Sequence, residues 1–422
     1  MTARARRLLP MVTVAALLSG TGCGGGGGGH HRTATVPTLT PGPSATPREP
    51  TPIATLSNVQ PITVDAGPTG DYTNGLFTSV TICMPNDDTQ CQTISGILVD
   101  TGSVGLRILS SVFSLPLPQE TAENGEPIAE CVPFLDSLAW GSVRLANVKL
   151  AGEEASALPI QVIGDPRLPT IPARCTSTGL PPADTVDTLH ANGILGVGVF
   201  REDCGAICET TDPANPGVYY ACSTTGCVEV AAPLSEQLQN PISRFSDNNQ
   251  GVVIELPSIP SSGAAGVSGS MIFGIGTQSN NGLAGANVLT LSPNGTFTTL
   301  FDAQSVTLSF LDSGSNGIFF LDPATTGIPT CARNHGFYCP PAPQTISTTL
   351  RGARGETLAA TFTAANADML FRANSDAVAF DDLAGPSPGI FDFGLPFFYG
   401  RRVFAAIEGQ PTPAGVGPYF AY

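Results

Sequence analysis

The chain has 422 residues, which is more than one compact core usually holds and predicts two domains or lobes. Only 12% of the residues are charged, whereas glycine and proline number 48 and 38, which excludes a helical bundle and favours strands joined by many turns. The net charge of −16 argues against nucleic acid as a partner, and a hydrophobic content of 41% is enough to fill a core.

Residues 1–22 are predicted to be a signal peptide. Three arginines precede a short apolar run over residues 8–18, and small residues follow, which is the pattern of a cleaved export signal. The run is too short to span a membrane. Gly20 to Cys23 resembles the lipobox of bacterial lipoproteins, in which Cys23 would be lipidated, although Gly20 stands where leucine is usual. The alternative is ordinary signal cleavage nearby.

Residues 23–55 are predicted to be a tether. Gly24–Gly29 is unbroken glycine, and threonine and proline alternate over residues 33–52, so neither part can bury a core. Gly24 is not the aspartate that is associated with inner-membrane retention. We therefore expect an exported protein in the outer membrane, in the periplasm or at the cell surface, with the lipid anchor as its only membrane contact.

The cysteines agree with export. There are eleven, and ten remain without Cys23, an even number that suits disulfides in an oxidising compartment. Spacing suggests three pairs and one cluster of four: Cys83 with Cys91, Cys331 with Cys339, Cys131 with Cys175, and the cluster Cys204, Cys208, Cys222 and Cys227. His335 between Cys331 and Cys339 raises a zinc alternative, but three ligands lack a clear fourth, so we favour a disulfide and no metal.

From residue 56 onward, short apolar runs alternate with turn residues, which predicts a mainly β structure. Helical stretches are few, at residues 233–238 and 364–371. We expect an N-terminal β lobe at 56–240 with a cysteine-rich insertion, and a C-terminal β lobe at 241–422. The clearest strand signals lie at residues 97–99, 143–150, 160–163, 252–254 and 271–273.

A motif occurs twice, about half the chain apart. Ile97–Ser103 and Ser309–Ser315 each run from an apolar strand into Asp, a hydroxyl residue, Gly and Ser. An apolar segment that abuts glycine follows each copy, at residues 192–196 and 392–395. A repeat of this length indicates a duplicated lobe rather than a solenoid unit.

At these residues the chain resembles the pepsin-like aspartic proteases, over roughly residues 60–422. It is also similar to a group of bacterial exported proteins of unknown function that carry such motifs. The resemblance implies two β lobes with a cleft between them. Each lobe would contribute one aspartate from its Asp–hydroxyl–Gly loop. Residues 192–198 and 393–397 would be the segments that support the two loops.

The resemblance assigns catalysis to Asp100 and Asp312. Two carboxyl groups held about 3 Å apart share one proton, so one can activate water while the other donates to the peptide carbonyl. No metal or organic cofactor is needed. We expect a monomer that acts on polypeptides as an endopeptidase. The supporting residues of the loops would be Thr101, Gly102, Ser103, Ser313, Gly314 and Ser315.

One feature departs from the family. Pepsin-like enzymes have a hairpin flap with a tyrosine between the first loop and its supporting segment, and residues 131–142 at that place contain none. Phe134 or Trp140 could serve instead as an apolar cover, or the flap could be shortened. The alternative function is therefore a non-catalytic protein that binds a protein ligand in the same groove.

Overall fold

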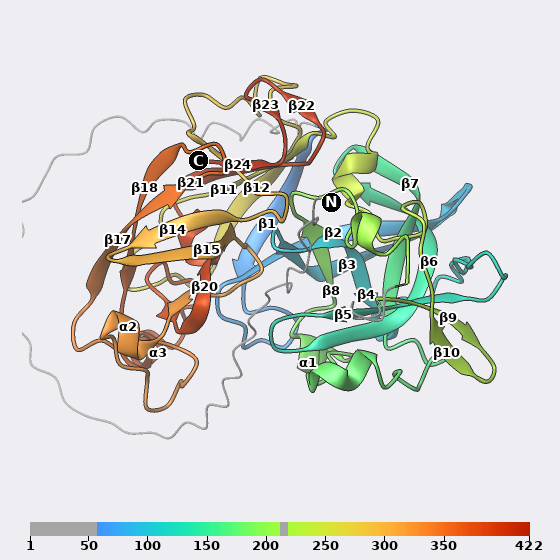
Figure 1. Ribbon diagram of the computed structural model, residues 1–422, viewed down its shortest axis with the longest axis horizontal. Coiled ribbons are helices and arrows are strands. Elements are labelled where there is room, and N and C mark those ends of the chain that lie inside the picture. The colour runs from blue at the N-terminus through green and yellow to red at the C-terminus, as the bar shows by residue number, and fades with distance from the viewer. Residues whose placement is uncertain (1–56, 212–217) are drawn as a thin grey trace, which may run out of the picture.

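The computed structural model describes residues 57–211 and 218–422. The predicted signal peptide, the tether and Cys23 lie outside these residues. The chain is mainly β and forms two lobes, with the N-terminal one in blue to green and the C-terminal one in yellow to red in Figure 1. One sheet has 15 strands and another has seven. The predicted fold class is confirmed.

The described part of the N-terminal lobe contains ten strands, all in the large sheet. Strand β8 lies between β3, to which it is parallel, and β4, to which it is antiparallel, and β4 and β8 are buried along their whole length. The strands are β1 (Val59–Asp65), β2 (Gly75–Met84), β3 (Asp87–Asp100), β4 (Val104–Leu109), β5 (Ile128–Pro133), β6 (Leu138–Leu150), β7 (Glu153–Ile163), β8 (Gly193–Val197), β9 (Tyr219–Ser223) and β10 (Gly226–Glu229).

The large sheet continues into the C-terminal half, because β1 pairs with β12. The predicted boundary at residue 240 stays a prediction. The strands that extend the large sheet are β11 (Gly251–Leu256), β12 (Val267–Phe273), β13 (Val288–Thr290), β21 (Arg401–Ala406) and β24 (Tyr419–Ala421). The smaller strands β22 (Pro411–Thr412) and β23 (Gly415–Val416) pair with each other.

The seven-stranded sheet belongs to the C-terminal lobe, and its core is rich in phenylalanine. Phe391 stacks on Phe393 and on Phe320, with ring centroids 4.7 and 5.1 Å apart. These rings fill the side of β20 that faces away from the site described below. The strands are β14 (Phe297–Phe301), β15 (Gln304–Leu311), β16 (Ile318–Leu321), β17 (Gln344–Arg351), β18 (Thr357–Ala364), β19 (Ala384–Gly385) and β20 (Ser387–Phe393).

Helices are short, and the helix predicted at residues 233–238 is wrong. That segment makes only a turn, because the Gln237 side chain bonds the backbone of Gly205 and Ala232 and the Leu238 N–H donates to the Tyr219 hydroxyl. The second predicted helix begins three residues late, at α3 (Ala367–Ala373), after a cap by Asn366. The other helical elements are α1 (Val186–Leu189), α2 (Pro323–Thr326), η1 (Ser110–Val112), η2 (Cys175–Thr178), η3 (Gly205–Ile207), η4 (Pro241–Arg244) and η5 (Leu395–Phe398).

Five disulfides confirm the predicted cysteine pairing. The cluster of four pairs as Cys204–Cys208 and Cys222–Cys227. The other pairs are Cys83–Cys91, Cys131–Cys175 and Cys331–Cys339, so the zinc alternative that used both sulfurs of the last pair is wrong. Among the helices of residues 57–211 and 218–422, none has the length and apolar character needed to cross a membrane.

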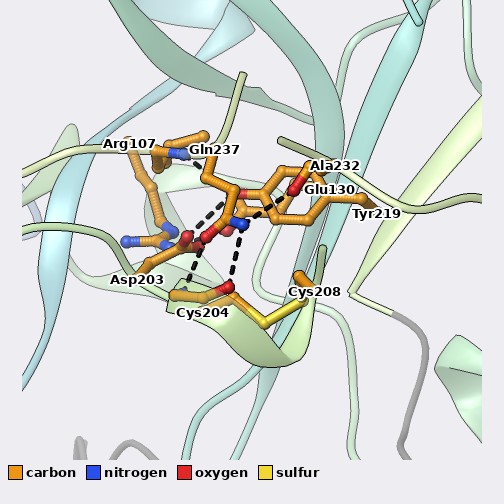
Figure 2. The surroundings of a disulfide bond; sticks show 10 residues. Arg107, Glu130, Asp203, Cys204, Cys208, Tyr219, Ala232 and Gln237 are labelled. Atoms are coloured by element: carbon orange, nitrogen blue, oxygen red, sulfur yellow. Dashed lines mark hydrogen bonds and ion pairs between the residues drawn. A yellow bond between two sulfur atoms is a disulfide. The ribbon is translucent and has the colours of Figure 1, made fainter. Parts of the chain in front are cut away.

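A buried ionic network fixes β4, the strand that follows the first Asp loop (Figure 2). Arg107 pairs with Glu130 at 2.8 Å and with Asp203 at 3.2 Å, and all three side chains are buried. The Tyr219 hydroxyl donates to the second oxygen of Asp203 at 2.8 Å. The network therefore ties β4 to β5 and to the loop that is closed by the Cys204–Cys208 disulfide.

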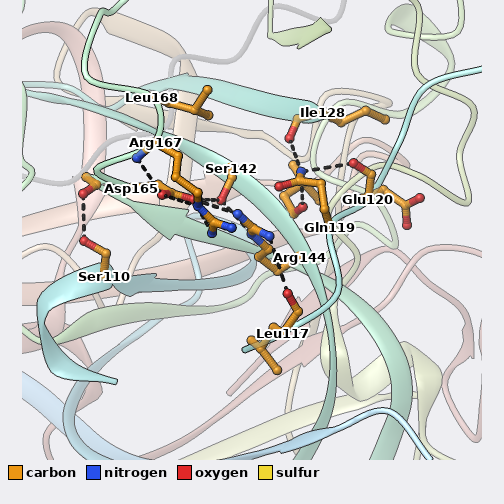
Figure 3. Close-up of polar contacts among 12 residues, drawn as sticks. Ser110, Leu117, Gln119, Glu120, Ile128, Ser142, Arg144, Asp165, Arg167 and Leu168 are labelled. Carbon is orange, nitrogen blue, oxygen red and sulfur yellow. Dashed lines mark hydrogen bonds and ion pairs between the residues drawn. The ribbon is translucent and has the colours of Figure 1, made fainter. Parts of the chain in front are cut away.

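A second polar cluster holds the root of the β5–β6 hairpin (Figure 3). Arg144 of β6 pairs with Asp165 at 3.0 Å, and the Ser142 hydroxyl donates to the same carboxylate. Arg167 pairs with Asp165 from the solvent side at 2.9 Å. These contacts anchor β6 to the turn after β7, so the base of the hairpin is rigid where it meets the lobe.

Candidate active site

Each aspartate lies at the C-terminal end of a strand that pairs in parallel with a supporting strand: β3 with β8 and β15 with β20. Asp100 closes β3, which is parallel to β8 with Asp100 opposite Gly196. Asp312 follows β15, and its N–H donates to the Phe393 carbonyl at 3.1 Å. A Cβ at Gly196 would lie 2.5 Å from the Val104 nitrogen, so only glycine allows the supporting strand to approach the loop this closely.

The two loops bond to each other in a reciprocal pattern. The Thr101 N–H donates to Ser313 Oγ at 3.1 Å, and the Ser313 N–H donates to Thr101 Oγ1 at 2.9 Å. Each hydroxyl then donates across to the strand before the opposite aspartate, Thr101 to the Leu311 carbonyl at 3.0 Å and Ser313 to the Val99 carbonyl at 2.8 Å. The loops are therefore locked together with approximate twofold symmetry.

Each carboxylate is held by its own loop in the same way. The glycine N–H two residues later donates to Oδ1, and the serine hydroxyl three residues later donates to Oδ2. The bonds are Gly102 N to Asp100 Oδ1 (2.7 Å), Ser103 Oγ to Asp100 Oδ2, Gly314 N to Asp312 Oδ1 (2.8 Å) and Ser315 Oγ to Asp312 Oδ2 (3.0 Å). All the predicted site residues that lie within residues 57–211 and 218–422 are thus together.

The two carboxyl groups face each other. A Cβ on Gly102 would lie 2.7 Å from Asp312 Cγ, and a Cβ on Gly314 would lie 2.8 Å from Asp100 Cγ. Both aspartates have 0% exposure. Burial, the charges of Asp100 and Asp392, and a hydrogen bond with Asp100 raise the pKa of Asp312 well above its usual value. The pair therefore keeps one proton at a pH where an isolated aspartate has lost it.

A third carboxyl group, which the sequence reasoning did not assign to the site, lies beside this pair. Asp392 of β20 has 0% exposure, and neither of its oxygens accepts a hydrogen bond of good geometry among the described residues. Burial raises the pKa of Asp392 well above its usual value, a hydrogen bond with the Ser315 side chain, which is shared with Asp312, opposes the rise, and the charge of Asp100 adds to it. The sequence feature that could have pointed to Asp392 is that it is an aspartate within an otherwise apolar supporting segment.

A tyrosine also lies near the pair, from a part of the chain where it was not sought. Tyr72 belongs to the connection between β1 and β2, before the first loop. Its hydroxyl is buried without a hydrogen-bond partner in the described structure. Burial and the charges of Asp136, Asp312 and Asp100 raise the pKa of Tyr72. A tyrosine therefore comes within electrostatic range of the pair although the hairpin has none.

The connection that carries Tyr72 is fixed against the C-terminal lobe by Asn74. The Asn74 amide donates to the carbonyls of Asn316 at 2.8 Å and Phe380 at 2.9 Å. Its oxygen accepts from the Phe380 N–H at 2.8 Å and from the Tyr399 hydroxyl at 2.9 Å. Because all of these groups are buried, Asn74 sets the position of Tyr72 relative to both loops.

Residues 131–142, where the sequence offered no clear equivalent of the flap, form a hairpin. β5 and β6 pair with Cys131 opposite Trp140. Phe134, at the turn, joins the same apolar cluster as Tyr72. Trp140 packs on Tyr220 with centroids 5.5 Å apart and donates to the Leu168 carbonyl, so it lies in a different cluster. Of the two candidate covers, only Phe134 packs with Tyr72.

Two β lobes that lock Asp–hydroxyl–Gly–Ser loops together define an architecture of the aspartic proteinase type. The crystal structure of an aspartic proteinase from Irpex lacteus is similar, with a TM-score of 0.50 and 13% identity over 86% of this chain and 96% of that one. That likeness shows the fold. The chain belongs to the family described as protein of unknown function (DUF3443), whose model matches residues 54–422. A comparison with curated proteins gave no match.

Proposed function

We propose that this protein is an aspartic-type endopeptidase in which Asp100 and Asp312 activate a water molecule. The observation that supports this most directly is the mutual placement of the two carboxyl groups, each next to the other's loop glycine. The substrate is a polypeptide, and the chain acts as a monomer without a metal or organic cofactor.

The roles of the two carboxyl groups follow from their protonation. Because the two carboxyl groups are buried against each other, the pair shares one proton and titrates as a unit. The ionised member accepts a proton from water as the water oxygen attacks the peptide carbonyl, and the protonated member donates its proton to the carbonyl oxygen. Collapse of the tetrahedral intermediate then breaks the C–N bond: the carboxyl group that took the proton from water passes it to the leaving amine, and a hydroxyl of the intermediate returns a proton to the other carboxylate, so the pair again shares one proton.

The test is cleavage of a mixed peptide library by the full chain between about pH 3 and 7, the range in which a coupled carboxyl pair titrates. Asp100→Asn and Asp312→Asn should each abolish cleavage, whereas Asp376→Asn, at an exposed aspartate, should not. Cleavage that survives either of the first two substitutions would show that another site is responsible.

One observation favours the alternative, a non-catalytic binding or surface-interaction protein. Both aspartates have 0% exposure, so water and substrate can reach the carboxyl groups only if surrounding residues move. A binder would retain a captured peptide intact and would keep its affinity in Asp100→Asn. Mass spectrometry of the bound peptide after overnight incubation separates the two functions.

We further propose that the protein is exported and tethered by lipid. Five disulfides are typical of an oxidising compartment. Lipidation at Cys23 would then place the lobes at the end of the tether, near the envelope. Fractionation of a Gram-negative host should find the wild type with membranes and Cys23→Ser in the soluble fraction. A wild type found wholly in the soluble fraction would mean ordinary secretion.

A further inference from the structure

The position of Asp392 is set by strand register. It lies opposite Phe310 of β15 and opposite Phe319 of β16. Register partners share one face of a sheet, and so do residues two apart on one strand. Asp312 directly follows β15, and its N–H continues the ladder by donating to the Phe393 carbonyl. Phe310 comes two residues before Asp312, so Asp392 is on the face from which Asp312 projects. Its neighbours Phe391 and Phe393 point to the opposite face, into the aromatic core.

The N-terminal lobe supplies an internal comparison. There, Leu98 lies two residues before Asp100 and opposite Ile194 of β8. The matching pair in the C-terminal lobe is Phe310 with Asp392. The fold therefore accepts an apolar side chain at this position, and Ile194 is buried just as Asp392 is. A carboxyl group at this place destabilises the fold relative to isoleucine, because it is desolvated and the Ser315 hydroxyl that it contacts also donates to Asp312.

The charged and polar groups around Asp392 come from the two Asp loops. The first Asp loop contributes Asp100, which acts on Asp392, and the second contributes Asp312, on which Asp392 acts. The Ser315 side chain, which also donates to Asp312, lies near Asp392. β16 presents only Phe319 in register. No basic side chain among the described residues contributes to the pKa shift of Asp392.

We propose that Asp392 is a positioning residue that forms a cluster of three carboxyl groups with Asp100 and Asp312 and holds the shared proton on that pair to higher pH. This inference rests on the proposed function. At acidic pH Asp392 is neutral and the pair carries one charge. When Asp392 ionises as the pH rises, its charge makes removal of the last proton of the pair harder. The active, singly protonated pair thus persists toward neutral pH.

The first test is the pH profile of kcat/KM for the full chain. Asp392→Asn preserves the size of the side chain, and Asp392→Ile copies the N-terminal lobe. Both should move the basic limb to lower pH by about one unit, a typical effect of a close like charge, and leave the acidic maximum within a few fold. Asp382→Asn, at a buried carboxyl that faces Asp381, is the matched control and should leave the limb in place. A basic limb that stays in place in both Asp392 variants overturns the proposal.

The second test does not require peptidase activity. At about pH 6 an unfolded aspartate is ionised, so a proton that the folded protein keeps is released on unfolding. Calorimetry in buffers of different ionisation enthalpy should find up to one proton fewer released by Asp392→Asn than by the wild type. A proton difference in an inactive protein would reject only the proposed function, whereas an active protein without the difference would reject the cluster. If Asp392→Ile does not fold, Asp392→Asn decides.

Discussion

The two Asp loops are nearly identical in backbone hydrogen bonding and differ in what surrounds them. The glycine N–H to Oδ1 distance is 2.7 Å in the first loop and 2.8 Å in the second. The supporting strand, however, presents Ile194 beside the first loop and Asp392 beside the second. The two loops thus share the geometry of the pair, whereas the chemical surroundings of its two members differ.

The lobes also differ in how they are stabilised. The N-terminal lobe contains a buried ionic network and a disulfide between residues 44 apart in sequence. The described part of the C-terminal lobe depends on stacked phenylalanines, and its disulfide joins residues only eight apart. Substitutions at matching features of the two lobes should therefore have unequal effects.

The largest loss of stability is expected in the ionic network of the N-terminal lobe. Glu130→Ala should lower the free energy of unfolding by about 3–5 kcal/mol, because Arg107 is left buried with less compensation. Urea unfolding measures the change. Replacing both residues, as in Arg107→Met with Glu130→Leu, should be less harmful than Glu130→Ala alone. Equal or greater loss in the double variant would show that the pair itself provides the stability.

The disulfides should rank by the length of chain that they close. Replacing Cys131 and Cys175 with serine should remove about 4 kcal/mol, because the pair closes a separation of 44 residues. The same change at Cys331 and Cys339, with a separation of eight, should remove about 2.5 kcal/mol. Urea midpoints of both variants test the ranking, and the reverse order would argue for structure in the unfolded chain.

Tyr72 should matter for activity and not for stability. Tyr72→Phe removes a buried hydroxyl without a hydrogen-bond partner, so the melting temperature should stay the same or rise. Loss of a donor near the pair should lower kcat/KM by about tenfold. Tyr422→Phe is the matched control, because its hydroxyl is also buried without a partner and the pKa shift of Tyr422 has no cause in the carboxyl pair. Equal kinetic effects in both variants would remove Tyr72 from the site.

The smallest effect concerns the pH dependence of stability at Asp382. Burial and the charge of Asp381 raise the pKa of Asp382 to about 6. A folded pKa above the unfolded value near 3.9 means that stability falls as pH rises from about 4 to about 6. Asp382→Asn should flatten this part of the stability curve and raise the melting temperature by a few degrees above about pH 6. An unchanged slope would place Asp382 in contact with solvent.

The sequence predicted the parts of the site that depend on local pattern. The loops around Asp100 and Asp312 could be found because an apolar strand, a tight turn and glycine occur together in each. Tyr72 could not be found, because its approach to the pair depends on the contacts of Asn74 with residues more than 240 positions away. Asp392 could not be assigned to the site from the sequence, because strand register decides the face of the sheet to which a side chain projects. The turn at 233–238 was misjudged because a distant tyrosine and a glutamine side chain take up its backbone groups.

The central claim is that Asp100 and Asp312 act as one unit, and kcat/KM of both single variants and the double variant tests it most directly. If the two carboxyl groups share one proton and one water, Asp100→Asn and Asp312→Asn should each lose on the order of a thousandfold or more, and the double variant should lose little beyond that. Losses that multiply in the double variant, or a single variant that keeps most of its activity, would contradict the claim.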